Sequence, residues 1–107
     1  MSNLPAIQRF ESSTKVRIYR IPCEVFPNFI GYAYVVLGAG EPTLVDTGSG
    51  YGDSTKHIIQ GIESLRTDFG ESVTREDFRR ILITHGHIDH FGGLAHLPKN
   101  SRARIGI

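Results

Sequence analysis

The chain has 107 residues, 39% of them hydrophobic and 21% charged, which is typical of a single globular domain and excludes a disordered or fibrous protein. Twelve Lys and Arg residues against eleven Asp and Glu residues give a formal net charge of +1, which excludes strong electrostatic attraction to nucleic acid or to an anionic membrane. Its single cysteine, Cys23, cannot form an intramolecular disulfide, so we expect a reducing compartment and a cytoplasmic location.

Neither a secretory signal nor a membrane span is expected. The N-terminus, MSNLPAIQRF, lacks the basic start and apolar core of a signal peptide. The longest uncharged stretch lies between Glu24 and Glu41, and it is shorter than the ~20 residues that a membrane-spanning helix needs. Because this stretch also contains Pro27 and Asn28, it predicts a loop and a strand.

The first half of the chain predicts three strands. Residues 16–21 (VRIYRI) alternate apolar and basic side chains, as in a strand with one buried face. Pro22 and Pro27 then indicate a loop. Residues 32–37 (YAYVVL) are aromatic and β-branched and predict a second strand, and after a turn Thr43–Val45 predicts a short third one.

A helix follows the third strand. Asp53 is a suitable N-cap and Gly70 a suitable C-terminal residue for it. Between them, apolar residues recur at the spacing of one helix face: Ile58, Ile59, Ile62 and Leu65.

Shorter elements complete the chain. Thr74 and Asp77 approximate a capping box, which predicts a short second helix. Residues 81–83 (ILI) predict a buried strand, residues 91–97 (FGGLAHL) the start of a short helix, and residues 104–107 (RIGI) the start of a strand. Strands come first and then mix with helices, so residues 1–107 predict one partial domain, the first half of a larger α/β sandwich with exposed sheet edges.

The candidate metal-binding residues lie close together in THGHIDHFGG, residues 84–93. His85 and His87 are two residues apart where a strand ends, so both imidazoles can point the same way, and Asp89 and His90 follow in the turn. Imidazole and carboxylate are good ligands for Zn²⁺ and also for Fe or Mn. Two such pairs can hold two metal ions ~3.5–4 Å apart and lower the pKa of a shared water.

A second motif, LVDTGSG at residues 44–50, leaves two interpretations open. Aspartic proteases carry their catalytic Asp in a similar Asp-Thr-Gly-Ser string, so Asp46 could be a general base in a dimer. Alternatively, Asp46 supports a metal site built from the histidine cluster.

The string HGHIDH matches the His-x-His-x-Asp-His signature of the metallo-β-lactamase superfamily. The preceding ILIT, the following FGG and the upstream LVDTG match its usual flanks, so the chain resembles this superfamily from residue 16 to its end. The resemblance implies an α/β fold, the N-terminal half of an αββα sandwich with a metal site at the sheet edge. It also implies hydrolysis of esters, thioesters, lactams, lactones or phosphodiesters, whereas oxidative members use iron.

Matching positions imply roles for five residues. His85 and His87 resemble ligands of a first metal, and Asp89 and His90 ligands of a second, with Asp89 also placed to accept a proton from the attacking water. Asp46 resembles a supporting aspartate beside the metals. A complete site would hold two Zn ions, with Fe or Mn as alternatives, and would act on a small-molecule substrate. The family's remaining ligands come from downstream segments, so a missing C-terminal half or a dimer partner is needed to complete the site.

Other polar features have simpler interpretations. His57 and His96 are expected to be structural. Asn28 and Phe29 could border a substrate, although ordinary turn chemistry explains them better. The glycine-rich residues 48–52 (GSGYG) lack the Lys-Ser/Thr ending of a phosphate-binding loop.

Three functions therefore compete. The first is a metal-dependent hydrolase, of which this chain is the N-terminal part. The second is a non-catalytic binding module with a partial metal site. The third is a dimeric aspartic protease built around Asp46, which leaves the histidine cluster unexplained.

Overall fold

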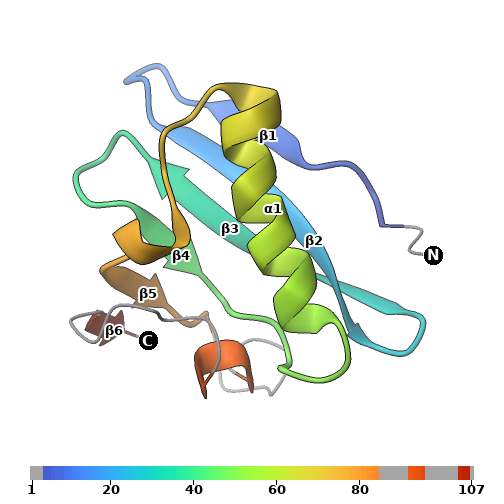
Figure 1. Cartoon of the computed structure of the whole chain (residues 1–107). Coiled ribbons are helices and arrows are strands. Elements are labelled where there is room, and N and C mark those ends of the chain that lie inside the picture. Colours follow the sequence, from blue (N-terminus) through green and yellow to red (C-terminus); the bar gives the residue numbers. More distant parts are fainter. Residues whose placement is uncertain (1–3, 85–91, 96–103, 107) are drawn as a thin grey trace.

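A mixed β-sheet with a helix across one face forms the chain (Figure 1). The computed structural model describes residues 4–84, 92–95 and 104–106. In these residues the strand order is β1-β2-β3-β4-β5-β6. The strands are β1 Gln8–Glu11, β2 Arg17–Phe26, β3 Phe29–Leu37, β4 Thr43–Val45, β5 Arg80–Leu82 and β6 Arg104–Gly106, and the helices are α1 Ser54–Phe69 with the 3-10 turns η1 Arg75–Asp77 and η2 Gly92–Ala95.

The direction of the strands changes in the middle of the sheet. β1 to β4 pair antiparallel, whereas β4, β5 and β6 pair parallel, with Leu44 opposite Ile81 and Ile81 opposite Ile105. The carboxyl ends of neighbouring parallel strands meet at one edge of a sheet. The residues that directly follow β4 and β5 therefore come together, and Asp46 lies beside Leu82 and Thr84.

The hydrophobic core lies between α1 and the sheet. Alternate residues of β2 point towards the helix and are buried, and three residues of the predicted helix face meet them: Tyr19, Ile21, Cys23 and Val25 against Ile58, Ile62 and Leu65. The helix crosses the sheet so closely that a Cβ on Gly61 would lie 2.4 Å from Cγ2 of Ile21.

The predicted loop at Pro22 is wrong, because β2 continues through this residue to Phe26. β1 pairs with β2 only as far as Arg20, so beyond it β3 is the only described neighbour of β2. Proline is tolerated on such an edge segment because its missing N–H interrupts no second ladder. β3 likewise starts at Phe29 rather than at Tyr32. The sequence pattern also missed β1, whose residues are all exposed and carry no alternation.

The helix ends agree with the predictions, with one correction. Gly70 is the C-cap of α1 at φ 73°, and Thr74 and Asp77 form a capping box in which the Thr74 N–H donates to Asp77 Oδ2 at 2.8 Å. Asp53 is the N-cap of α1, but its side chain makes no capping hydrogen bond.

A polar network ties the chain after α1 to β2. Glu71 accepts hydrogen bonds from Arg17 Nε at 2.6 Å, from Arg17 Nη2 at 3.1 Å and from the Tyr19 hydroxyl at 2.6 Å. The Arg17 guanidinium holds the pKa of the Glu71 carboxyl below its ordinary value of 4.5, although partial burial acts in the opposite direction.

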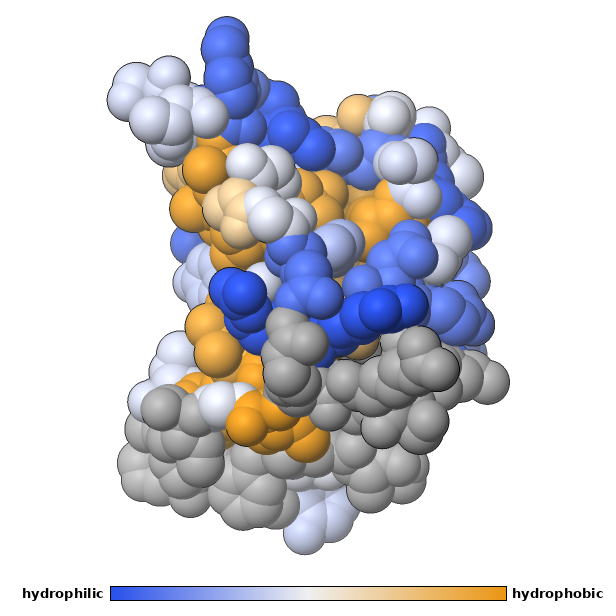
Figure 2. Space-filling model, turned by 90° about the vertical axis from the view of Figure 1, so that its left-hand side faces the viewer, coloured by the Kyte–Doolittle hydropathy of each residue, from blue (hydrophilic) through white to orange (hydrophobic). Residues whose placement is uncertain are grey.

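Apolar side chains remain on the outside of the sheet. Leu82 is 38% and Ile105 52% exposed, and Figure 2 shows hydrophobic surface on both sides of a hydrophilic band on one side of the molecule. None of the helices in the described part of the chain combines the length and hydrophobicity that crossing a membrane requires.

Candidate metal centre

Asp46 lies where β4 ends, next to the end of β5. Its backbone N–H donates to the Leu82 carbonyl at 2.7 Å, which continues the parallel pairing by one residue. The Asp46 backbone then turns with φ 67°, a left-handed conformation that Asp adopts more readily than most residues. Its side chain is buried, with 3% of the residue exposed.

The Asp46 carboxylate holds Thr84. The Thr84 N–H donates to Asp46 Oδ1 at 2.8 Å, and the Thr84 hydroxyl lies 3.1 Å from Oδ1 and 2.9 Å from Oδ2. Thr84 is the residue directly before His85 in the sequence. Asp46 therefore fixes the backbone at the point where the histidine motif begins. We call this arrangement the Asp46–Thr84 clamp.

The loop between Asp46 and α1 is held by serine hydroxyls, and its first residues, 47–49, are buried. The Ser49 hydroxyl donates to the Val25 carbonyl and accepts from the Tyr51 N–H at 3.1 Å, while the Ser49 N–H donates to Ser54 Oγ at 3.1 Å. Gly48 has φ 69°, a left-handed conformation that glycine adopts without strain. The loop is thus a fixed support rather than a free connection.

The far end of the histidine motif packs on this same loop. A Cβ on Gly92 would lie 1.9 Å from the Ser49 carbonyl oxygen, and one on Gly93 would lie 2.0 Å from the Thr47 carbonyl oxygen. The Gly93 N–H donates to the Gly48 carbonyl at 3.3 Å. At both glycines the two backbones therefore approach too closely to leave room for a side chain. The residues on either side of 85–91 are therefore held against one loop.

The predicted metal ligands His85, His87, Asp89 and His90 lie outside the described residues, and so does His96. Among residues 4–84, 92–95 and 104–106, no three His, Cys, Asp or Glu side chains are grouped as a metal site. His57 is buried and its Nδ1 accepts the Glu24 N–H at 3.0 Å, which confirms its structural role. Asn28 has φ 63°, which is typical of a turn residue.

The sequence did not reveal Thr84 or the two serines as partners of the site. Thr84 is 38 residues from Asp46 in the sequence, and nothing in the local pattern connects them. The feature of the sequence that could have indicated Thr84 is its position directly between a buried strand and the histidine cluster. The geometry also argues against the protease interpretation, because a carboxylate that is buried and bonded by Thr84 is not presented to a second copy.

The described residues form an α/β fold in which Asp46 and Thr84 meet at the carboxyl ends of two parallel strands. Residues 27–107 match the family model described as Metallo-beta-lactamase superfamily. The chain belongs to this superfamily. No curated protein sequence matches it.

Solved structures of this superfamily resemble the chain. MEM-A1, a subclass B3 metallo-β-lactamase isolated from a soil metagenome library, is 27% identical with a TM-score of 0.60, and the Rm3 metallo-β-lactamase is 30% identical with a TM-score of 0.58. Each match covers 82% of this chain and 28% of the other protein. AidC, a dizinc quorum-quenching lactonase, shares the fold at 17% identity and a TM-score of 0.61, covering 97% of this chain and 45% of AidC. The chain thus spans less than half the length of these relatives.

Proposed function

We propose that the chain is the N-terminal, metal-binding part of a metal-dependent hydrolase. Its substrate would be a small molecule with an ester, thioester, lactone, lactam or phosphodiester bond. The observation that carries the proposal is the Asp46–Thr84 clamp, which holds the backbone directly before the histidine motif at the carboxyl ends of two parallel strands.

The donor set of the motif fits a metal. His85 and His87 would bind a first ion and Asp89 and His90 a second, and three imidazoles with one carboxylate are the ligands that Zn²⁺ prefers, with Fe or Mn as alternatives. Two Zn ions per complete site agree with the dizinc description of AidC. When bound, the metal supplies Lewis-acid activation of water and substrate.

The protein residues have separate tasks in this proposal. Asp89 accepts the proton released by the attacking water, and Asp46 keeps the start of the ligand segment in place through Thr84. The remaining ligands would come from a C-terminal half or from a dimer partner. A cytoplasmic location is also proposed, because the single cysteine, Cys23, is a buried free thiol.

A non-catalytic binding module is the second candidate. One observation favours it: the chain spans only 28% of MEM-A1 and Rm3, so it contains part of such a domain. The two candidates differ in turnover rather than in metal binding.

The test is hydrolysis by the chain and by a longer form that includes any downstream residues of the gene. A panel of one ester, thioester, lactone, lactam and phosphodiester is assayed with Zn²⁺, after chelation and after Zn²⁺ is restored. We expect turnover of at least one substrate that chelation abolishes. Asp89→Asn should lower it by about 10²-fold or more, whereas the exposed Asp68→Asn should not. Metal retention without turnover in both forms would favour the binding module.

A further inference from the structure

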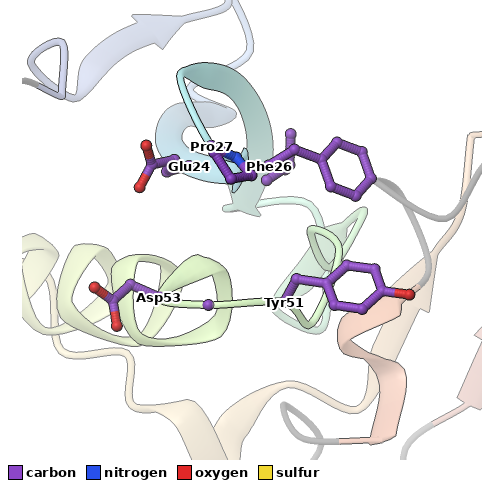
Figure 3. A pocket seen from close by; sticks show the side chains of 7 residues that line it. Glu24, Phe26, Pro27, Tyr51 and Asp53 are labelled. Carbon is purple, nitrogen blue, oxygen red and sulfur yellow. The ribbon is translucent and has the colours of Figure 1, made fainter.

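A pocket of about 620 Å³ opens where the β2–β3 hairpin passes the loop before α1. Figure 3 shows its lining side chains in two groups that face each other across the opening. One group comes from the end of β2 and the other from the loop: Glu24, Val25, Phe26 and Pro27, and Tyr51, Gly52 and Asp53. The volume lies within the ~300–1,000 Å³ that small-molecule sites occupy.

Aromatic rings form one side of this pocket. The rings of Phe26 and Tyr51 are 5.8 Å apart with 39° between their planes, and Phe29 stacks on Phe26 at 6.4 Å. Tyr51 is 59% and Phe29 55% exposed. Such rings offer apolar area together with negatively polarised faces, which attract cations.

Carboxylates form the other side. Figure 3 shows the side chains of Glu24 and Asp53 on the side opposite the rings of Phe26 and Tyr51. Glu24 uses Oε2 to accept the Asn28 N–H at 3.1 Å. Asp53 makes no capping bond to α1, although it occupies the N-cap position where an Asp normally makes one. Its carboxylate therefore accepts no hydrogen bond from the first turn of the helix.

Both walls of the pocket are fixed by hydrogen bonds. His57 Nδ1 accepts the Glu24 N–H at 3.0 Å, which ties β2 to α1. The Ser49 hydroxyl donates to the Val25 carbonyl and accepts the Tyr51 N–H at 3.1 Å, which ties the loop to β2. A site whose walls are held in this way needs little ordering when a ligand binds.

We infer that this pocket binds a small organic ammonium ion with an apolar body. The ammonium group would lie between the carboxylates of Glu24 and Asp53, and the apolar body would lie against Phe26 and Tyr51. The negative charges of Glu24 and Asp53 favour a cation, because no Lys or Arg is among the described residues that line the pocket. Binding here needs no metal and does not depend on the proposed hydrolysis.

The test compares three ligands of nearly equal size on the chelator-treated protein: 2-phenylethylammonium, 2-phenylethanol and phenylacetate. Binding is followed by NMR chemical shifts of the backbone amides. We expect 2-phenylethylammonium to shift the amides of Tyr51 and Gly52 and to bind at least about fivefold more tightly than the neutral alcohol, with phenylacetate weakest.

Variants separate charge from shape. Glu24→Gln with Asp53→Asn keeps the shape of the pocket and should lower the affinity for the ammonium ion to that for the alcohol. The matched control, Glu63→Gln with Asp68→Asn, neutralises two exposed acidic residues of α1 and should have no effect. Thermal unfolding of each variant checks that it is folded.

Several results would overturn the inference. They are equal affinity for the ammonium ion and for phenylacetate, shifts confined to other residues, and no binding at millimolar concentration. If the double variant fails to fold, the comparison of the three ligands on the unchanged chain still decides.

Discussion

Substitutions of Asp46 in the Asp46–Thr84 clamp can separate the effect of its side-chain shape from the effect of its charge. Asp46→Ala removes both oxygens that Thr84 contacts and leaves the Thr84 N–H and hydroxyl without this acceptor. Asp46→Asn keeps an oxygen that can accept the Thr84 N–H, and Asn tolerates the φ of 67° found here. The two variants should therefore differ in stability more than in metal affinity.

The magnitude follows from the contacts. Hydrogen bonds to a charged group contribute about 1.5–3 kcal/mol, and a left-handed Ala adds about 1–2 kcal/mol of strain. Thr84 is exposed, so water can replace part of the hydrogen bonding that Asp46→Ala removes. We expect Asp46→Ala to lower the free energy of unfolding by about 2–3 kcal/mol and Asp46→Asn by about 1 kcal/mol or less.

Metal affinity should respond to the charge. Loss of a residue that supports metal ligands lowers metal affinity or activity about 10–100-fold. We expect Asp46→Asn to weaken Zn²⁺ binding by such a factor and to leave partial activity that added metal restores in part.

Urea unfolding with a chelator measures the stability, and competition with a chromophoric chelator measures Zn²⁺ affinity. Asp68→Ala, an exposed change on α1, is the control. The reasoning would be refuted if Asp46→Ala were as stable as the unchanged chain. Activity that ignores chelators and vanishes in Asp46→Asn with metal content untouched would restore the protease interpretation.

Three further predictions test other parts of the structure. Gly93→Ala should destabilise the chain by about 1–3 kcal/mol in urea unfolding, because its Cβ would lie 2.0 Å from the Thr47 carbonyl oxygen; unchanged stability would contradict the close packing. Because Arg17 lowers the pKa of Glu71 in the folded chain, the stabilisation from Glu71 is present above the ordinary pKa of 4.5 and is lost as the pH falls through the lowered value. Glu71→Gln should thus cost about 1.5–3 kcal/mol at pH 7 and flatten the fall in stability below pH 4.5, and an unchanged acid profile would refute this. The 107-residue chain should bind a hydrophobic dye or self-associate, and a monodisperse monomer without dye binding would contradict the expected exposed apolar surface.

Elements with a strong local pattern could be predicted from the sequence. The helix face of α1, the short strand Thr43–Val45 and the C-cap Gly70 follow from periodicity and from the special backbone of glycine. β1 could not be predicted, since its residues are all exposed and only pairing with β2 holds it in place. Pro22 led to the prediction of a loop because proline normally interrupts a strand with two hydrogen-bonded neighbours. The sequence does not show that this part of β2 has only one described neighbour.

The sequence leads to a prediction of the metal ligands, which stays a prediction, but it gave no indication of the contacts that support them. The spacing of the histidine motif indicates a metal by itself, whereas the Asp46–Thr84 clamp joins residues that only the parallel pairing of β4 and β5 brings together. The pocket between Phe26 and Tyr51 could not be predicted from a local sequence pattern either, because its two walls come from separate segments.

Metal content tests the central claim most directly. The purified chain is dialysed against trace Zn²⁺, and its zinc is measured by elemental analysis beside that of His85→Ala/His87→Ala and of the exposed control Gln60→Ala/Glu63→Ala. We predict that the unchanged chain and the control retain zinc and that the histidine variant loses most of it while staying folded. An unchanged zinc content in the histidine variant would contradict the assignment of the metal site.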